Sequence, residues 1–327
     1  MKRLNAALIA SVFCLGASAV GPAQAQGYPN KPVRLIVPVG PGSGTDIITR
    51  VMADQLAEQM KATFVVENRA GGGGMVGAAS VVQSNPDGYT LLMASNGPLL
   101  ISPLLHVKPP YDPLRDLTAV TKIATMPFTV VTGPNAPYST FKEIIAFIKA
   151  NPGKVNYATS GKGTQSHLEV AVFLQMHGLK AQDIAYKNHA TAMTEIMAGL
   201  VDFYFPVYPA AAPHVNSGKM RALAIGTAQR SPLAPDLPTF AEAMERPGFQ
   251  MSAWFGFVAP AGTPAEIIAK LNDEITKAMT APKVRERLTG LGAEIAVTPT
   301  KQYGEDLRQE TEKWVKVITE LGLRSDK

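Results

Sequence analysis

Cysteine is almost missing from this chain. The 327 residues include one, Cys14, and it lies in an apolar stretch near the N-terminus. Lys2 and Arg3 precede that stretch, and a small-x-small cleavage site, Ala23-Gln24-Ala25, follows it. We therefore expect residues 1–25 to be a cleaved secretory signal peptide. Its removal would leave no cysteine, which excludes disulfides, thiol chemistry and zinc–thiolate sites from the exported protein.

Long apolar runs are also missing. The N-terminal stretch, Ala6–Val20, is too short to cross a bilayer, and no later segment reaches the ~18–20 apolar residues that a spanning helix needs. Cys14 has a second interpretation, as the lipid-bearing cysteine of a lipoprotein. The bulky Phe13 before it disfavours that interpretation, because a small residue is wanted there.

The chain also lacks a large excess of charge of either sign. Charged residues make up 17% of the chain, and the net charge of +5 falls to +3 when Lys2 and Arg3 are removed. The remaining basic residues are scattered and have no interleaved aromatic residues, so nucleic acid is not predicted as a partner. A hydrophobic content of 46% predicts a globular protein, and the length is sufficient for two domains.

Common catalytic and cofactor motifs are missing too. The chain has no His-Glu-x-x-His, no Gly-x-Ser-x-Gly and no Walker loop. Gly72-x-Gly74-x-x-Gly77 matches the dinucleotide fingerprint in letters only, since it follows the second expected strand and Asp87 lies in a turn. We therefore predict no catalytic residue, no metal and no cofactor. An enzyme on an α/β scaffold is the weaker alternative.

Two similar loops are the strongest positive signal. They are Gly40-Pro41-Gly42-Ser43-Gly44-Thr45-Asp46 and Ser160-Gly161-Lys162-Gly163-Thr164-Gln165-Ser166. Each follows a short apolar run and precedes a helical pattern, so each places backbone N–H groups and hydroxyls at a helix N-terminus, where anions bind. Two such loops in different halves of the chain indicate a cleft that grips one ligand from both sides. The alternative is a pair of ordinary capped turns.

The pattern around these loops predicts an α/β protein. Short apolar strands alternate with helical stripes, which favours a mostly parallel sheet covered by helices. After Pro264 the chain is expected to be helical to its end. The expected strands are 33–37, 64–66, 89–94, 128–132, 155–159, 183–186, 203–207, 221–226 and 254–259, and an expected helix runs from a Ser139/Thr140 cap to Ala150.

Asp46 and His167 each allow two interpretations. We interpret Asp46 as a residue that orders the first loop, because a carboxylate aimed at an anion would repel it. Its alternative is to fix a water or a ligand amino group. His167 follows the second loop by one turn, where it would donate to a bound carboxylate. Packing on the helix is an equally good interpretation of His167.

Several stretches resemble one family, the extracytoplasmic solute receptors of tripartite tricarboxylate transporters, also called Bug proteins. The resemblance covers essentially the whole mature chain in order. Its motifs are Tyr28-Pro29-x-Lys31-Pro32, the Pro-x-Gly-x-Gly-x-Gly-Thr-Asp loop ending at Asp46, Val66-x-Asn68-Arg69-x-Gly71-Gly72-Gly73, Asn85-Pro86-Asp87-Gly88-Tyr89-Thr90, Tyr157-Ala158-x-Ser160-Gly161-x-Gly163-Thr164-x-Ser166-His167-Leu168, Gly218-Lys219-Met220-Arg221-Ala222-Leu223-Ala224, Pro235-Asp236-Leu237-Pro238-Thr239 and Ala259-Pro260-Ala261-Gly262-Thr263-Pro264.

The resemblance implies a two-lobed type II periplasmic-binding-protein fold with a ligand cleft between the lobes. By analogy, residues 26–126 plus 250–327 form lobe I and residues 127–249 form lobe II. It also implies a monomer that binds a small carboxylate, mostly a dicarboxylate, in the periplasm, while an aromatic acid is the alternative that the chain's own aromatic residues raise. Membrane transporter subunits would receive the ligand. A sensory receptor that signals to a histidine kinase is the alternative.

The family's ligand contacts carry over to matching positions of this chain. They are Gly42, Ser43, Gly44, Thr45, Asp46 and Asn96 in lobe I, and Ser160, Gly161, Gly163, Thr164 and His167 in lobe II. Two departures suggest an atypical ligand. Tyr186-Lys187-Asn188-His189 stands where the family often has Tyr-Lys-Gly, and Phe203–Tyr208 is unusually aromatic. Core packing is the favoured role of Phe203 and Phe205 within that stretch.

Overall fold

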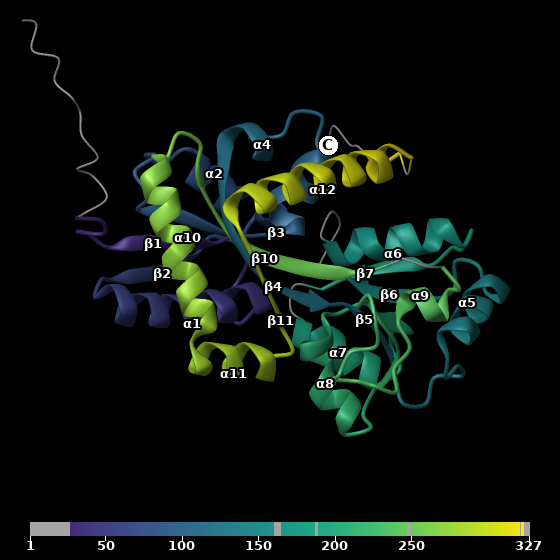
Figure 1. Ribbon diagram of the computed structural model, residues 1–327. Helices are drawn as coiled ribbons and strands as arrows, with labels where there is room; N and C mark the ends of the chain where they lie inside the picture. The colour runs from purple at the N-terminus through teal and green to yellow at the C-terminus, as the bar shows by residue number, and fades with distance from the viewer. Residues whose placement is uncertain (1–26, 160–164, 187–188, 247–249, 321, 324–327) are drawn as a thin grey trace, which may run out of the picture.

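The computed structural model describes residues 27–159, 165–186, 189–246, 250–320 and 322–323, which fold around two separate sheets (Figure 1). One sheet has the strand order β11-β4-β10-β3-β1-β2, and the other has the order β7-β6-β8-β5-β9. The predicted two-lobed α/β architecture is confirmed. We call the body around the six-stranded sheet lobe I and the body around the five-stranded sheet lobe II. The residues at which one lobe passes into the other remain a prediction.

Lobe I is built from both ends of the described chain. Its strands are β1 (Val33–Val37), β2 (Phe64–Asn68), β3 (Thr90–Ser95), β4 (Leu117–Pro127), β10 (Ser252–Pro260) and β11 (Glu294–Thr298). Its helices are α1 (Gly44–Met60), η1 (Gly72–Gly74), α2 (Met75–Val82), η2 (Gly97–Ile101), α3 (Ser102–Leu104), α4 (Pro113–Asp116), α10 (Ala265–Thr280), α11 (Pro282–Gly290) and α12 (Thr300–Glu320).

Lobe II is built from the middle of the chain. Its strands are β5 (Thr129–Thr132), β6 (Asn156–Thr159), β7 (Gln182–Ala185), β8 (Phe203–Tyr204) and β9 (Arg221–Ile225). Its helices are α5 (Phe141–Ala150), α6 (Gln165–Met176), α7 (His189–Met197), α8 (Tyr208–Asn216) and α9 (Phe240–Ala243). None of the helices in the described ranges has the length and apolarity that a membrane crossing requires.

Helices cover both faces of each sheet, so each lobe has three layers (Figure 1). In lobe I, α1 and α10 bury apolar side chains on one face, while α2, η2 and the start of α12 cover the other. In lobe II, α5, α6 and α9 pack on one face, and α7 and α8 pack on the other. The strands are therefore buried on both faces, which explains why most read as short apolar runs.

The element α5 shows how local sequence sets a boundary. The Thr140 side chain accepts a hydrogen bond from the Glu143 amide, and the Glu143 carboxylate accepts one from the Thr140 amide. This capping box satisfies amides that a helix start leaves unpaired. Beyond Ala150, Gly153 has a φ of +72°, a conformation that glycine adopts without steric cost. The prediction of a helix from this cap to Ala150 is confirmed.

Three strand predictions need correction. The sequence did not indicate β4, whose pairing with β10 is broken by two register shifts that disturb the alternation of buried residues. Nor is the end of the chain wholly helical, because β11 pairs with β4 at the edge of the sheet. Finally, strand 203–207 is shorter than expected: β8 ends at Tyr204, and Val207 forms only an isolated bridge to Phe128.

The carboxyl ends of the parallel strands face the crossovers between the lobes. In lobe I, β1 pairs in parallel with β2 and β3, whereas β10, which enters from lobe II, runs antiparallel to β3. In lobe II, β6 pairs in parallel with β7 and β8, whereas β5, which enters from lobe I, runs antiparallel to β8. Both sheets are therefore mixed rather than mostly parallel, and their carboxyl ends point toward the same junction.

Candidate functional site

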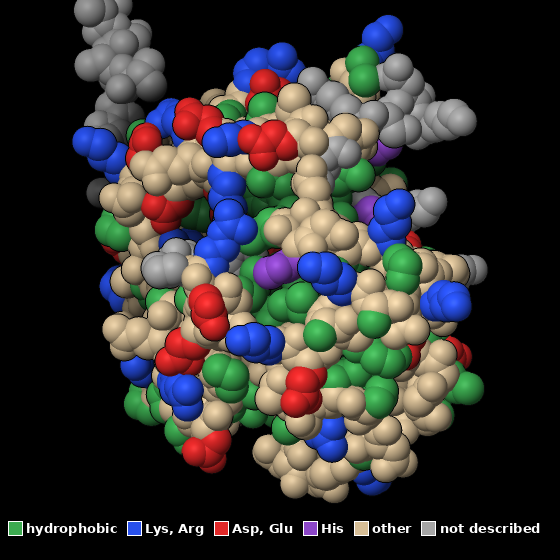
Figure 2. Space-filling view, turned by 90° about the vertical axis from the view of Figure 1, so that its right-hand side faces the viewer, with side chains coloured by type: hydrophobic (Ala, Val, Ile, Leu, Met, Phe, Trp, Pro, Cys, Tyr) green, Lys and Arg blue, Asp and Glu red, His purple; other side chains and the backbone are tan. Residues whose placement is uncertain are grey.

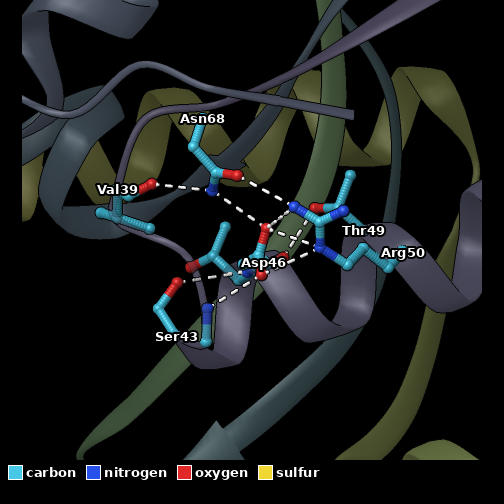
Figure 3. Close-up of polar contacts among 8 residues, drawn as sticks. Val39, Ser43, Asp46, Thr49, Arg50 and Asn68 are labelled. Atoms are coloured by element: carbon cyan, nitrogen blue, oxygen red, sulfur yellow. Dashed lines mark hydrogen bonds and ion pairs between the residues drawn. The ribbon is translucent and has the colours of Figure 1, made fainter. Parts of the chain in front are cut away.

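The first glycine-rich loop joins β1 to α1 at this junction (Figure 3). Ser43 is the N-cap of α1: its backbone is extended, and its hydroxyl accepts a hydrogen bond from the Asp46 amide at 3.2 Å. Gly42 has a φ of +77°, which a side chain at that position would strain. Gly42 is exposed, while Ser43 and Gly44 are half-buried. The sequence therefore folds this loop as a helix start that stays open to solvent.

Asp46 holds the loop from behind. Its carboxylate accepts hydrogen bonds from the Gly42 amide at 2.9 Å, from the Asn68 side-chain amide at 2.9 Å and from the Arg50 guanidinium at 3.1 Å. Asn68 lies at the end of β2 and also donates to the Val39 carbonyl at 3.1 Å. Figure 3 shows the Asn68 and Arg50 side chains converging on the Asp46 carboxylate. The interpretation of Asp46 as a loop-ordering residue therefore agrees with its contacts.

The Asp46 carboxylate is held ionised. Only 3% of the residue is exposed, and burial alone would raise its pKa. The hydrogen bonds from Arg50, Gly42 and Asn68 outweigh that effect and bring the pKa below its ordinary value. Part of this network has a signal in the sequence, because Arg50 follows Asp46 by four residues on the helix. The role of Asn68 has no such signal, since it depends on how β2 is placed.

The helix start leaves donors unused. Within the described residues, the amides of Gly44 and Thr45 donate to no protein group, while the Asp46 and Ile47 amides bond to Ser43. These two N–H groups lie in the first turn of a helix of 17 residues, where the helix dipole favours an anion. Lobe I thus presents neutral donors in a fixed geometry, which suits a carboxylate.

Asn96 lies one residue beyond β3, on the same edge. Only 3% of it is exposed, and its side-chain amide already forms hydrogen bonds within the protein. Its carbonyl accepts from the Trp254 amide at 3.0 Å, and its NH₂ group donates to Glu310 at 2.7 Å. Asn96 therefore forms part of the wall of lobe I, and sequence reasoning missed both Trp254 and Glu310 as its partners.

The second glycine-rich loop falls largely outside the described residues. Four of its predicted ligand contacts lie outside them and remain predictions: Ser160, Gly161, Gly163 and Thr164. The structure does describe the residues on either side. Thr159 ends β6 and donates to the Asp183 carboxylate at 2.6 Å, and His167 lies half-buried in the first turn of α6. His167 is thus at the predicted edge of lobe II.

The two edges face each other directly. Leu168, in the first turn of α6, packs in one buried cluster with Ile101 of η2 and with Trp314 and Ile318 of α12. Leu168 follows the second loop, and η2 follows Asn96, so the cluster joins the two carboxyl edges across the junction. Figure 2 shows a recess between the upper and lower parts of the molecule, with apolar, basic and histidine side chains at its rim.

The aromatic stretch that begins in β8 has two roles. Phe203 and Phe205 are buried in the core of lobe II, as the sequence favoured. Tyr204 is also buried, and its hydroxyl makes a hydrogen bond with Nδ1 of His189 at the start of α7. Lys187 and Asn188 lie outside the described residues. Within the stretch 186–189, which departs from the family's pattern, the structure therefore describes His189 as a residue that the buried Tyr204 holds at the edge of lobe II.

Thr227 is a polar residue that sequence reasoning missed. It follows β9, beside Gly226, whose amide donates to the Phe128 carbonyl at the crossover. Thr227 is 8% exposed, and its hydroxyl has no hydrogen-bond partner within the described part of the chain. A buried hydroxyl without a partner costs free energy unless a water or ligand satisfies it.

Other features of the surface do not compete with this site. A cavity of about 360 Å³ lies between α4, the start of β4 and the start of α12, and one of about 160 Å³ lies beside Pro134 and Gly199. Both lie away from the facing edges. Among the described residues, no group of three His, Cys, Asp or Glu side chains is placed to hold a metal ion.

Comparisons with known proteins identify relatives of this chain. The chain is 35% identical to Protein BugT of Bordetella pertussis over 99% of both chains. The structure of periplasmic binding protein BugD superposes with a TM-score of 0.82 at 30% identity, covering 91% of this chain and 99% of that one.

Two further structures contain ligands. The structure of Rpa4515 from R. palustris with adipate has a TM-score of 0.83 at 30% identity, covering 90% of this chain and 98% of that one. That of MatC from Rhodopseudomonas palustris with bound malate has a TM-score of 0.80 at 29% identity, covering 89% and 100%. Residues 48–323 match the tripartite tricarboxylate transporter family receptor, and the chain belongs to that family.

Proposed function

We propose that this chain is a periplasmic solute-binding protein that captures a dicarboxylate and delivers it, as a monomer, to a membrane transporter of the tripartite tricarboxylate type. The observation that carries the proposal is the pair of facing edges, one of which presents the unused amides of Gly44 and Thr45. The family match supports the transport role. The predicted signal peptide over residues 1–25 supports the location.

The chemistry of lobe I favours a carboxylate that is bound and released. The donors at Ser43, Gly44 and Thr45 are neutral, and the nearby cation, Arg50, is already paired with Asp46. A carboxylate would therefore gain charge-assisted hydrogen bonds without forming a tight ion pair. Asp46 orders these donors, and Asn96 shapes the wall beside them.

The far end of the ligand would meet lobe II. His167 and the predicted contacts at Ser160, Gly161, Gly163 and Thr164 supply polar groups there. Phe203 and Phe205 are packed in the core, which disfavours stacking on an aromatic acid. A second carboxylate is the better fit, in keeping with relatives whose structures contain adipate and malate. Binding would then favour the arrangement in which both lobes contact the ligand.

A thermal-shift screen tests the ligand class. Acetate, malate, succinate, adipate, citrate and benzoate should be compared, because a ligand that binds only the folded state raises the melting temperature. We expect the dicarboxylates to give the largest rise. A rise with benzoate alone would contradict the dicarboxylate assignment, and no rise with any of them would contradict carboxylate capture.

Substitution of Gly44 tests the site. Gly44→Pro removes one unused amide at the first position of α1, where proline is tolerated, and the extended backbone of Ser43 suits a residue before proline. Gly44→Ala is the matched control, since it keeps the amide, and its Cβ would meet Met126 at an ordinary 3.5 Å. We expect titration calorimetry to show about tenfold weaker binding for the proline variant alone. Equal affinities would refute the assignment.

A further inference from the structure

One carboxylate gathers three N–H donors where α12 crosses the ends of β3 and β10. Glu310 accepts hydrogen bonds from the Asn96 amide at 2.7 Å, from the Trp254 indole, and from the Trp314 indole at 3.3 Å. Trp254 and Trp314 are the two tryptophans of the chain. Glu310 belongs to none of the sequence motifs, yet it bonds a residue of the lobe I wall.

These contacts fix the orientation of Asn96. Its carbonyl accepts from the Trp254 backbone, so its NH₂ group must point toward Glu310, which accepts from it. Trp254 is buried and meets the Tyr303 ring edge-on, with the ring centroids 5.6 Å apart. Hydrogen bonds to a carboxylate are stronger than those between neutral groups, so Glu310 is the dominant polar partner in this cluster.

The same helix continues from this cluster to lobe II. Trp314 follows Glu310 by one turn and packs with Ile318 against Ile101 of lobe I and Leu168 of lobe II. Near the end of α12, the Gln175 side chain of α6 donates to the Glu320 carbonyl at 3.4 Å. Figure 1 shows α12, in yellow, extending from lobe I to a position above α6. One helix thus contacts the wall of lobe I at Asn96 and the first turn of α6.

We propose that Glu310 is a positioning residue of the ligand site, which couples the lobe I wall at Asn96 to closure onto lobe II through Trp314. This rests on the proposed capture function. Loss of the Glu310 carboxylate would release Asn96 on one side and the turn bearing Trp314 on the other. The contact between Trp314 and Leu168 would then weaken, and the closed arrangement, in which the edges of the two lobes face each other, would become less populated.

Glu310→Gln tests the coupling, since it preserves shape but replaces one acceptor oxygen by an NH₂ group that opposes an indole N–H. Glu305→Gln is the matched control, because Glu305 is exposed on the same helix and contacts Arg308 and Gln309. With adipate and malate as probes, stopped-flow tryptophan emission should show about tenfold faster dissociation and unchanged association for Glu310→Gln. Both tryptophans contact Glu310, so their emission reports on this cluster.

A ligand-free measurement separates this proposal from the proposed function. Spin labels at Asp54→Cys in lobe I and Lys149→Cys in lobe II, with Cys14→Ser, would report the distance between the lobes. We expect Glu310→Gln to shift the distribution to longer distances, and Glu305→Gln to leave it unchanged. If neither acid binds but the distances shift, the coupling holds and dicarboxylate capture fails. If Glu310→Gln lowers only the melting temperature and leaves the distances unchanged, the coupling is refuted.

Discussion

The two facing edges are stabilised by different physics. In lobe I, charged and amide side chains hold the loop: Asp46 accepts from Gly42, Arg50 and Asn68. In lobe II, aromatic packing supports most of the described edge, together with the hydrogen bond from Thr159 to the Asp183 carboxylate. Phe173 lies within 5.6 Å of the Phe141 and Phe205 rings, measured between centroids, and Tyr204 anchors His189.

This difference assigns different tasks to the two lobes. Hydrogen bonds to a buried carboxylate are directional, so the Asp46 network fixes amide donors in one geometry suited to one chemical group. Aromatic packing is less directional and leaves the side chains above it free to differ. Lobe I would therefore bind a carboxylate in the same way in different ligands, while lobe II would select the rest of the ligand.

The largest expected effect comes from breaking the lobe I network. Asp46→Ala removes the acceptor of the Gly42 amide and leaves Arg50 and Asn68 without their partner. We expect adipate affinity to fall by about 2–3 kcal/mol, because hydrogen bonds to charged groups contribute about that much. Titration calorimetry measures it. Asp54→Ala, at an exposed position of the same helix, should leave the affinity unchanged.

An unchanged affinity in Asp46→Ala would show that the loop keeps its form without the carboxylate. The distinction between a lobe I loop held by hydrogen bonds to Asp46 and a lobe II edge held by aromatic packing would then be wrong. A fall in affinity of similar size in Asp54→Ala would instead indicate a general effect of charge on α1.

The sequence predicted the parts of this comparison that depend on local chemistry. The start of α1 at the glycine loop and the role of Asp46 both follow from neighbours in the chain. Burial of Phe203 and Phe205 was likewise favoured by their place on an expected strand, although Phe205 lies one residue beyond the end of β8. The strand β1 has the predicted bounds, because it is a short apolar run that ends at Pro38.

The contacts between distant segments were not predictable in this way. Asn68 reaches Asp46 only because β2 pairs with β1, and Glu310 reaches Asn96 across 214 positions of the chain. Strands β4 and β11 were missed because bulges and an edge position weaken the alternation of apolar residues. A single sequence carries no signal for such pairings, since they depend on how whole elements pack.

A smaller effect should follow from Thr227, which lies at the crossover between the two kinds of edge. Thr227→Val keeps the shape and removes a buried hydroxyl that lacks a partner in the described chain. If a ligand or its bound water satisfies that hydroxyl, affinity for adipate should fall by about 1 kcal/mol, while the melting temperature stays level or rises. Lower stability with unchanged affinity would show that the hydroxyl serves the fold instead.

The smallest effect should appear in the pH dependence of stability, because the two lobes should lose stability in different pH ranges. Asp46 has a lowered pKa in the folded state, so its contribution to stability is present above the unfolded value near ~4 and is lost as pH falls below it. His177, at the end of α6, has a pKa lowered by burial and by the charge of Arg246. The unfolded chain therefore binds more protons than the folded one once pH falls below ~6.5.

Acid should thus weaken lobe II at a higher pH than it weakens lobe I. Urea unfolding between pH 5 and pH 7 should show a free energy of unfolding that rises with pH, and His177→Gln should flatten part of that slope. Burial also lowers the pKa of His189, which contributes to the slope in the same direction. Asp46→Asn should not change the slope in this range, because the lowered pKa of Asp46 lies below it. The imidazole of His177 is only half-buried, which keeps the effect small. An unaltered slope in His177→Gln would show that the tilted contact of this ring with Phe173, rather than its protonation, is its contribution to lobe II.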